Sequence, residues 1–477
     1  MISPARLPRL LAGTLPALAL GACSLAPKYA PPTPPVPGSW PVGDAYLVQT
    51  PADLPLVAYT EIFRDPRLQA LIEQALANNR DLRLAAANIE AARAQIRVIR
   101  ADQFPAVGLS GSATDAETGG GFGLNGWSFS LGGGISSFEL DLFGRLANAT
   151  RAQRAAALST EAAARTVRLG VVADVAQAWA NYAADSELLR IAENTAANAE
   201  ENVRLSQARL RGGIAARTEL RQAQLVLETA RSDLAAQKTA LAQDINALRL
   251  LVGADFDQGL LATSIEAVNG TLGDVPPGTD TRVLLRRPDV LSAEYDLRAA
   301  NADIGVARAQ LFPTISLSAL IGFASTSLST LFDSASETTT LSGSTRWSIF
   351  NAGGAKASVA VAKAQRDAAL AAYEKAIQTA FSEASNALAT QGTLGERMRS
   401  AQAYTEASRD NARLVEATYR AGIASSLDNL DAQRSLYAAR QAEIAVRLAA
   451  ATNRITLYRV LGGDQASPSA ARVPAQE

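Results

Sequence analysis

The one cysteine of this 477-residue chain, Cys23, is the side chain with the clearest covalent chemistry. It follows Leu20-Gly21-Ala22, which closes an apolar run over 10–20 that begins after two arginines. A basic start, a short apolar core and small residues at its end are typical of a secretory signal peptide. A thiol at such a cleavage point can be acylated, and the pattern is similar to the bacterial lipobox.

We therefore predict that residues 1–22 are a lipoprotein signal peptide and that Cys23 is the acylated first residue of the mature chain. Acyl chains such as palmitate would hold the protein on a membrane surface. Ser24, in place of an aspartate, favours the outer membrane. The alternative is a plain signal peptide with an incidental cysteine.

The other side chains give little sign of catalysis. There is no histidine and no second cysteine, so the commonest general base and the commonest metal ligands are missing. A net charge of −1 provides no overall attraction for nucleic acid. We expect no enzyme activity, no metal, no cofactor and no nucleic-acid partner.

A long internal repeat organises the chain. Arg204–Gly253 aligns without a gap with Arg413–Gly462, about 209 positions downstream, and a shorter match joins 100–105 to 308–313. The period is too long for a solenoid, so it indicates a duplicated half.

The repeat and the composition predict the segments. A proline-rich, lipid-anchored tether is expected over 23–60, because no helix tolerates that proline density. The first repeat is predicted over 61–270, the second over 271–462, and a tail over 463–477.

Each half contains a long helical hairpin. Proline-free helical patterns over 146–211 and 355–421 predict helices of roughly 100 Å, and return helices are predicted over 218–251 and 427–461. Such alanine-rich helices, with few bulky residues, must pack closely against partners. A filamentous coiled coil is the alternative.

Shorter signals refine this pattern. Asp65-Pro66 is a helix start, Asn78-Asn79 predicts a stop or kink, and a further helix is expected over 81–102. Gly392 and Gly395 are expected to disturb the long helix that contains them.

Alternation of apolar with small polar residues predicts two β-hairpins, over 105–142 with a loop over 115–125 and over 314–350 with a loop over 325–337. Strands of about ten residues cross a bilayer. Four strands are too few to close a barrel, and unpaired strand edges are not tolerated in lipid. Several copies must therefore share one barrel. Three copies would give twelve strands. A soluble four-stranded sheet is the alternative.

Acidic residues gather where the long hairpins turn. Glu219 aligns with Asp428, each six residues past a turn glycine, and Asp431 lies one helical turn further. In an oligomer these acids would form rings that favour cations or set a gate. The alternative is that they only complement the helix dipole.

Two tryptophans, Trp127 and Trp347, lie on the predicted return strands. They mark either an aromatic girdle at a lipid interface or packing in a core.

At this point the chain resembles the TolC/OprM family of bacterial outer-membrane efflux channels, in its lipoprotein branch. Besides the lipobox, the segments that carry the resemblance are spread over nearly the whole mature chain: Phe63–Arg83, Phe138–Arg145, Leu284–Glu294, Ala307–Leu317, Tyr373–Ala389 and Leu430–Arg440. The resemblance implies a mainly α fold with a membrane β-barrel part: a homotrimer whose long helical hairpins form a periplasmic α-barrel tunnel and whose strands form one twelve-stranded barrel.

The same resemblance implies partners and a gate. A periplasmic membrane-fusion adaptor and an inner-membrane, proton-driven (RND-type) transporter would feed the duct, and outer-membrane lipid would surround it. Tyr419, Asp431 and Arg434 match positions that hold the tunnel tip shut by hydrogen bonds and ion pairs.

The hairpin turns with Gly212, Gly213 and Gly422 would contact the adaptor; the alternative is an ordinary helical turn with a glycine cap. The loop from Ser325 to Thr340 is short for the family.

The predicted function is therefore a lipid-anchored outer-membrane exit channel of a tripartite efflux pump, which passively conducts drugs or other small solutes. The alternatives are a duct for protein secretion and a structural lipoprotein that spans the periplasm.

Overall fold

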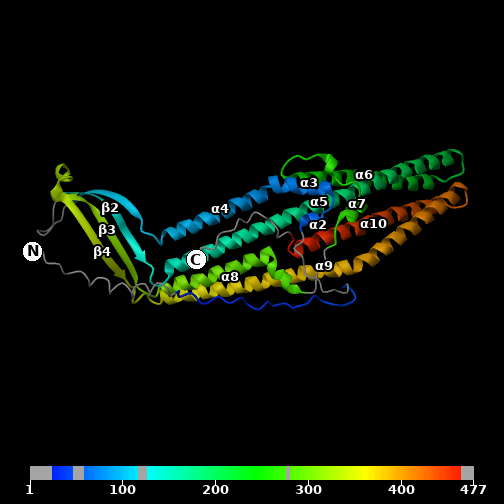
Figure 1. Ribbon diagram of the computed structural model, residues 1–477. Coiled ribbons are helices and arrows are strands. Elements are labelled where there is room, and N and C mark those ends of the chain that lie inside the picture. Colours follow the sequence, from blue (N-terminus) through cyan, green and yellow to red (C-terminus); the bar gives the residue numbers. More distant parts are fainter. Residues whose placement is uncertain (1–23, 47–57, 117–125, 275–279, 464–477) are drawn as a thin grey trace, which may run out of the picture. The chain divides into compact units, whose positions relative to one another are not determined.

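The computed structural model describes residues 24–46, 58–116, 126–274 and 280–463. The protein is mainly helical, with one antiparallel sheet (Figure 1). It forms two compact units, and both halves of the sequence contribute to each. The strand unit consists of the described residues within 24–34, 87–162 and 291–375. The hairpin unit consists of the described residues within 35–86, 163–290 and 376–463.

The sheet of the strand unit has the order β1-β2-β3-β4. Its strands are β1 (Val107–Ala116), β2 (Gly126–Leu140), β3 (Thr314–Ser325) and β4 (Glu337–Arg346). Both predicted hairpins are therefore present, and residues 117–125 of the first loop lie outside the described residues.

The predicted end of the last strand is wrong. The strand was expected to continue through Trp347 to Ile349, but it ends at Arg346. There the Trp347 indole nitrogen donates a hydrogen bond to the Leu311 carbonyl at 3.2 Å. The backbone then takes positive φ values at Ala352 (52°) and Gly353 (87°), which turn the chain toward the next helix.

The register separates the side chains of the sheet into two faces. Directly paired residues share a face, so the pairs Leu109–Gly133, Leu131–Phe323 and Ala319–Leu341 belong to one apolar face. The other face is made of serine, threonine and glycine, and includes the pairs Ser112–Ser130 and Ser318–Ser342. Leu320 is the one large apolar residue paired on that polar face.

A β-bulge keeps this separation intact. The register of β2 against β3 shifts between Ile135 and Phe138, where three steps on β2 match two steps on β3. The extra residue restores the alternation, so Phe138 pairs with Leu317 on the apolar face.

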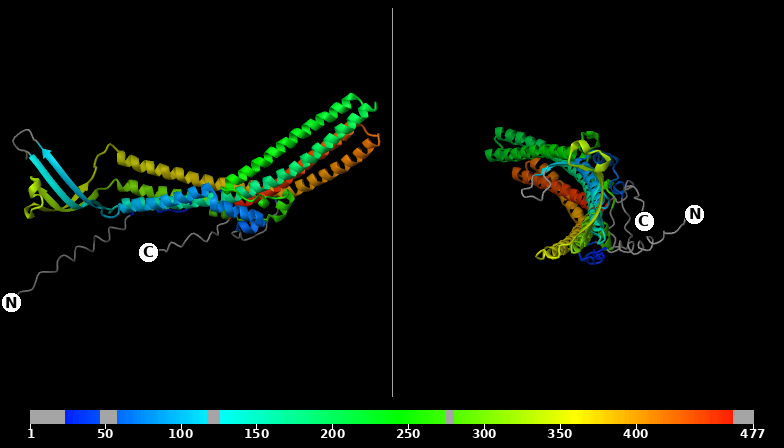
Figure 2. Two further views of the ribbon diagram at one scale, coloured as in Figure 1. Left: turned by 90° about the horizontal axis from the view of Figure 1, so that it is seen from above. Right: turned by 90° about the vertical axis from the view of Figure 1, so that its left-hand side faces the viewer.

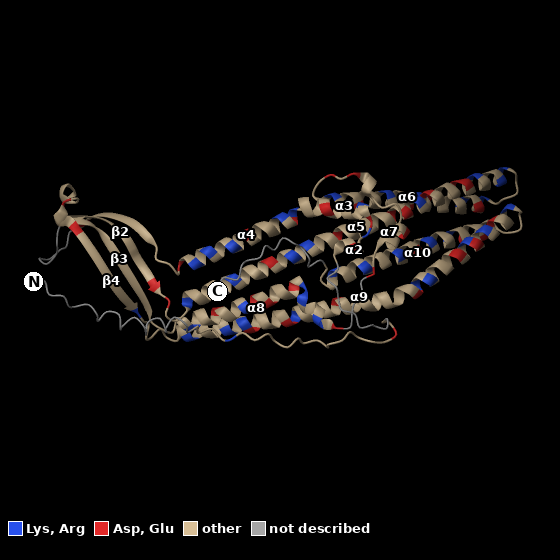
Figure 3. Cartoon of the chain, in the orientation of Figure 1, with Lys and Arg blue, Asp and Glu red and all other residues tan. Residues whose placement is uncertain are grey.

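Charged residues of the four strands lie only near their ends. These are Asp115, Glu139, Glu337 and Arg346. In Figure 3 the middle of the strands is accordingly tan, whereas the helices carry many blue and red residues. The sheet thus has an uncharged middle, as the hydrocarbon layer of a membrane requires.

The long helices begin and end within one residue of their predicted bounds. They are α5 (Arg145–Arg211), α6 (Arg217–Val252), α9 (Gly354–Arg420) and α10 (Ser426–Val460). In the hairpin unit the ends of the two hairpins lie side by side (Figure 2). Alanines permit this close packing: Ala196 and Ala199 of α5 meet Leu227 and Ala230 of α6.

Shorter helices complete the structure. They are α2 (Tyr59–Ile62), α3 (Pro66–Asn78), α4 (Arg80–Ala101), α7 (Ile265–Thr271) and α8 (Pro288–Ala309), with 3₁₀ turns at Gln258–Leu260, Thr281–Arg286, Leu328–Thr330 and Ser334–Ser336. The predicted helix start at Asp65 and the predicted stop at Asn78-Asn79 are both confirmed. The Asp65 carboxylate accepts from the Arg67 amide at 2.9 Å, and the Asn79 side chain accepts from the Asp81 amide at 2.9 Å.

The proline-rich segment contains no helix over residues 24–46, and its part from residue 35 onward packs against the rest of the hairpin unit. Trp40 is only 2% exposed and stacks on Phe381, with ring centroids 5.7 Å apart. The Thr281 hydroxyl donates to the Pro37 carbonyl at 2.6 Å. The part of this segment in the hairpin unit is therefore a strap held by the body rather than a free tether.

The prediction that two glycines disturb α9 is wrong, because the helix runs through both. Gly392 instead lets the strap approach: a Cβ at this position would clash with the Ala45 carbonyl. Gly395, one turn later, has only the flexible end of Arg399 within 4 Å.

This pair provides a matched test of strap packing. Alanine favours a helix over glycine by about 1 kcal/mol, so Gly395→Ala should raise the melting temperature or leave it unchanged. Gly392→Ala should lower it, because overpacking costs about 1–3 kcal/mol. Thermal melts of both variants in detergent would check this; equal stabilisation by the two substitutions would contradict the close approach.

Candidate functional site

Three separate features are candidate functional sites: the ends of the two long hairpins in the hairpin unit, and the two faces of the sheet and the segment that follows Cys23 in the strand unit. At the hairpin ends, Gly213 (φ 74°) and Gly422 (φ 77°) adopt the left-handed conformation that caps a helix. Gly212 shows no such conformation. After each capping glycine an isoleucine protrudes: Ile214 is 76% exposed and Ile423 is 80% exposed.

The acids that the repeat aligns have different environments. Asp428 forms a capping box with Ser425: its carboxylate accepts from the Ser425 hydroxyl at 2.7 Å and from the Ser425 amide at 3.1 Å. These hydrogen bonds lower the pKa of Asp428. Glu219 lies half-buried in the first turn of α6, which begins without a side-chain cap at Ala216. Asp428 therefore has a local structural role that Glu219 lacks.

The three residues that the family resemblance assigns to a gate fall into two groups. Asp431 and Arg434 form an ion pair of 2.8 Å on the same helix, and both side chains are more than half exposed. Tyr419 is 3% exposed, on the facing helix α9. Among the described residues Tyr419 forms no hydrogen bond with Asp431 or Arg434.

The partner of Tyr419 is a residue that the sequence analysis missed. The Arg209 guanidinium of α5 lies over the Tyr419 ring, 4.6 Å from its centroid. The repeat aligns Arg209 with a threonine, Thr418, so symmetry between the halves gave no signal for it. This contact joins the end of the first hairpin to the end of the second.

A second contact and a cavity lie behind these ends. The Asn202 amide of α5 donates to the Gln433 side chain of α10 at 2.9 Å. Close by, a cavity of about 250 Å³ is lined by residues of α5, α6 and α10, including Val226, Arg434 and Tyr437. Arg434 thus lines a space between the two hairpins as well as pairing with Asp431.

The segment after Cys23 is held by the strand unit, although Cys23 itself lies outside the described residues. The Ser24 hydroxyl donates to Asn148 at 2.9 Å and accepts from Arg151 at 2.9 Å. Arg308 donates to the Leu25 carbonyl at 3.0 Å. Asn148 and Arg151 are in the first turns of α5, just after β2, so the chain near Cys23 is fixed where the strands join the helices.

The two tryptophans lie near opposite ends of the sheet. Trp127 pairs with Asp115 beside the first hairpin loop, whereas Trp347 follows the far end of β4. They are 54% and 56% exposed in the single chain, so neither is a core residue there.

One acidic pair inside the first long hairpin has perturbed protonation. Burial, the charge of Asp185 and a hydrogen bond with it raise the pKa of Asp244 to about 7. Burial also raises the pKa of Asp185. Asp185 is on α5 and Asp244 is on α6, so one proton shared between these carboxyl groups links the two helices.

The helices in the described residues each lack an apolar stretch of the length needed to span a lipid bilayer. No group of three acidic, cysteine or histidine residues in this part of the chain could hold a metal ion.

Comparisons with known proteins agree with this architecture. The outer membrane efflux protein family matches residues 71–254 and 281–463. The probable efflux pump outer membrane protein TtgC of Pseudomonas putida is 40% identical over 461 residues, 95% of each chain. The cation efflux system protein CusC of Escherichia coli K12 is 38% identical over 460 residues, 94% of this chain and 97% of that one.

Solved structures also show similarity to outer-membrane channels. A crystal structure of CusC superposes with a TM-score of 0.82 at 37% identity and covers 92% of this chain and 100% of that chain. The open-state MtrE outer membrane channel of Neisseria gonorrhoeae has a TM-score of 0.81 at 31% identity, over 93% of this chain and 98% of that one. Fold and sequence thus define an outer-membrane channel class rather than an enzyme class.

The chain belongs to the outer membrane efflux protein family. It is an outer-membrane exit channel of the efflux-pump type, and such channels work with an adaptor and an inner-membrane transporter.

The acidic pair predicts a pH dependence of stability. The folded chain keeps the Asp244 proton up to about pH 7, whereas an unfolded aspartate loses it near pH 4. Stability should therefore be full below about pH 4 and fall as the pH rises through 7. Asp244→Asn should remove this fall and stabilise the protein at pH 8, on the order of 1–2 kcal/mol after solvent screening.

Melting temperatures of the wild type and the variant between pH 5 and 8 would measure this effect. Asp255→Asn, at an exposed position, is the control and should keep the wild-type slope. An unchanged slope in Asp244→Asn would show that the pair does not share a proton.

Proposed function

We propose that three copies of this chain build one continuous outer-membrane duct, in which their sheets share a twelve-stranded barrel and their long hairpins line a periplasmic tunnel. The observation that carries this proposal is the sheet itself. It has one apolar face, one polar face and an uncharged middle, and two edge strands that each have a single partner among the described residues.

The edges favour an oligomer. In the described residues, β1 and β4 each leave one row of backbone N–H and C=O groups without a partner strand. In hydrocarbon each unsatisfied group costs several kcal/mol, so the edges must be paired. Pairing β4 of one copy with β1 of the next closes a cylinder when the sheets together reach at least eight strands; three sheets give twelve.

The two faces set the inside and the outside. The apolar face, with side chains such as Leu341 (81% exposed), Ile321 (62%) and Leu109 (78%), would face lipid. The serine- and threonine-rich face would line a water-filled lumen. Strands of ten residues span about 33 Å before tilt, and Trp127 and Trp347 would then mark the two membrane interfaces.

The lumen wall suggests a passive duct. Its middle carries hydroxyl groups and glycines but no charge, so it offers no strong basis for selecting one solute. Relatives are named for toluene, solvents, antibiotics and cations, which fits a channel whose transporter chooses the cargo. We therefore propose drugs or other small solutes as the cargo, supplied through an adaptor by a proton-driven transporter of the RND type.

Lipid anchoring is part of the proposal. Acyl chains on Cys23 would enter the membrane beside the place where Ser24 is held by Asn148 and Arg151. These residues lie at the ends of the strands that join the helices, and the helices are proposed to lie in the periplasm. The anchor would therefore lie at the periplasmic surface of the outer membrane.

The gate is proposed at the hairpin ends. Tyr419 held by Arg209 would restrain the ends of the two hairpins in the closed state. Asp431 and Arg434, which pair on one helix in the single chain, would act at the same end by contacts between copies in the trimer. Glu219 and Asp428 would add acidic rings there, with Asp428 also serving as a cap. The turns with Gly212, Gly213 and Gly422, and their protruding isoleucines, would contact the adaptor.

Adjacent residues of β4 test the assignment of the faces. Leu341→Lys places a charge toward lipid and should cost about 2–4 kcal/mol, so the amount of trimer in outer-membrane fractions should fall strongly. Ser342→Lys places the same charge toward the lumen and should leave assembly intact while it lowers cation conductance. Equal assembly of both variants would contradict the assignment of the two faces.

The gate is tested by conductance. Replacement of Asp431 and Arg434 by alanine should raise single-channel conductance in planar bilayers severalfold, because the restraint at the narrow end is lost. The control is the ion pair Asp410–Arg413 on α9. These residues are also three positions apart, and the Asp410 carboxylate lies 2.7 Å from the Arg413 guanidinium. The variant with alanine at both control positions should conduct like the wild type. Unchanged conductance of the first variant would exclude Asp431 and Arg434 from the gate.

A further inference from the structure

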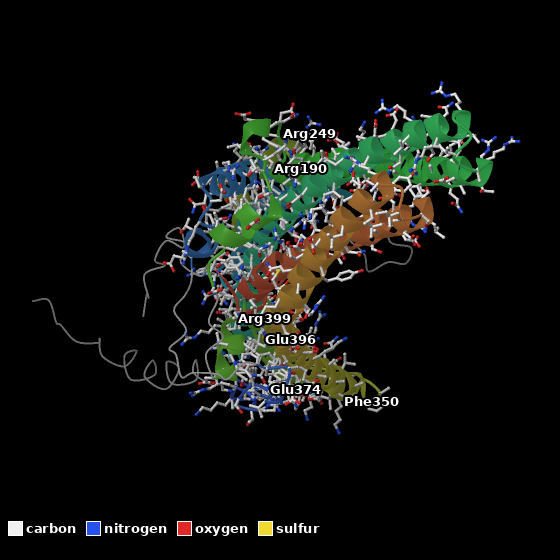
Figure 4. All side chains as sticks on the ribbon, turned by 90° about the vertical axis from the view of Figure 1, so that its right-hand side faces the viewer. Arg190, Arg249, Phe350, Glu374, Glu396 and Arg399 are labelled. Carbon is white, nitrogen blue, oxygen red and sulfur yellow. The ribbon has the colours of Figure 1, made fainter. Side chains whose placement is uncertain are left out.

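A second cavity of the hairpin unit has a different character from the one behind the hairpin ends. It has a volume of about 400 Å³ and is lined by residues of α5, α7, α9 and α10. Four arginines and three glutamates face it, whereas large apolar side chains are few. The arginines are Arg190, Arg409, Arg440 and Arg447; Arg190 is labelled in Figure 4.

Three of these arginines have acidic partners. Arg447 binds Glu443 at 2.6 Å and Glu266 at 3.1 Å. Arg409 forms an ion pair with Glu406 on its own helix. Arg190 is within 3.8 Å of Glu187.

Arg440 has none. Among the described residues its guanidinium forms no hydrogen bond and no ion pair, although the side chain is half-buried. Burial, together with repulsion from Arg409 and Arg190, lowers the pKa of Arg440. Half-buried guanidinium groups usually have an anionic partner, because burying a charge without one is costly.

The remaining acid of the cavity does not neutralise Arg440. One carboxylate oxygen of Glu187, Oε2, is buried without a hydrogen-bond partner, and the other is the one near Arg190. Among the four arginines that line the cavity, Arg440 alone has no acidic partner in the described residues, and guanidinium groups from three helices surround the cavity.

We propose that this cavity binds a small oxyanion, of the phosphate or sulfate class, through Arg440 together with Arg190 and Arg409. Planar guanidinium groups match the oxygens of such anions with paired, charge-assisted hydrogen bonds. The volume leaves room for bridging water molecules. This site does not depend on the trimer or on the gate.

The anion would also stabilise the contact between the two long hairpins. Arg190 belongs to α5 of the first hairpin, whereas Arg409 and Arg440 belong to α9 and α10 of the second. Without an anion the three guanidinium groups repel one another across this junction. With an anion the repulsion becomes attraction, so binding should stabilise the folded protein by mass action.

Thermal melting of the full-length protein in detergent tests the site, with inorganic phosphate titrated against sodium chloride at matched ionic strength. The wild type should show a saturable rise in melting temperature with phosphate beyond the rise with chloride. Arg440→Gln should weaken the apparent phosphate affinity at least tenfold. The control Arg204→Gln, at an exposed arginine of α5 paired with Glu201, should respond like the wild type.

Two outcomes would overturn the proposal: no phosphate-specific rise in the wild type, or an equal rise in Arg440→Gln. A third result is that phosphate does not change the melting temperature of the wild type, whereas Arg440→Gln lowers the number of chains per particle. Arg440 then pairs with an acid of a neighbouring chain, and the proposal is wrong. Should Arg440→Gln fail to fold, equilibrium dialysis of the wild type with radiolabelled phosphate decides. One phosphate per chain, displaced by sulfate but not by chloride, supports the site, and no bound phosphate refutes it.

Discussion

The unpaired backbone groups of the two edge strands limit how this protein can be placed in a membrane. Within the part of the chain that the structure describes, β1 and β4 each leave a row of polar backbone groups without a partner strand. One face of this sheet is apolar and its middle is uncharged. Such an edge is costly in hydrocarbon. A sheet of this kind therefore needs a partner strand at each edge, and the edge strands of sister copies would supply these partners. The family to which the chain belongs consists of channels, in agreement with this requirement.

The helices follow a different packing rule. Their contacts rely on alanine and on few bulky side chains, as where Ala196 and Ala199 meet Leu227. Close packing of this kind builds long, smooth helical hairpins rather than a thick core. The contacts between the hairpins near their ends include Arg209 over Tyr419 and the hydrogen bond from Asn202 to Gln433.

Much of the fold could be predicted from the sequence, because helix starts and stops are local signals. Proline at 66, asparagine at 79 and the glycines at 213 and 422 act within one turn, and the structure has a helix boundary at or beside each. Long-range contacts could not be predicted this way. The strap around Trp40, the close approach at Gly392 and the pairing of Arg209 with Tyr419 join residues far apart in the chain. The candidate site shows the same limit: the turn glycines were found, whereas Arg209 and Arg440 were not.

The most direct test of the central claim is the number of chains in each detergent-solubilised particle, measured by native mass spectrometry of the full-length protein. We expect three chains per particle. A particle with one chain that keeps its four-stranded sheet would show that the open edges need no sister copies, and the shared barrel would then be ruled out.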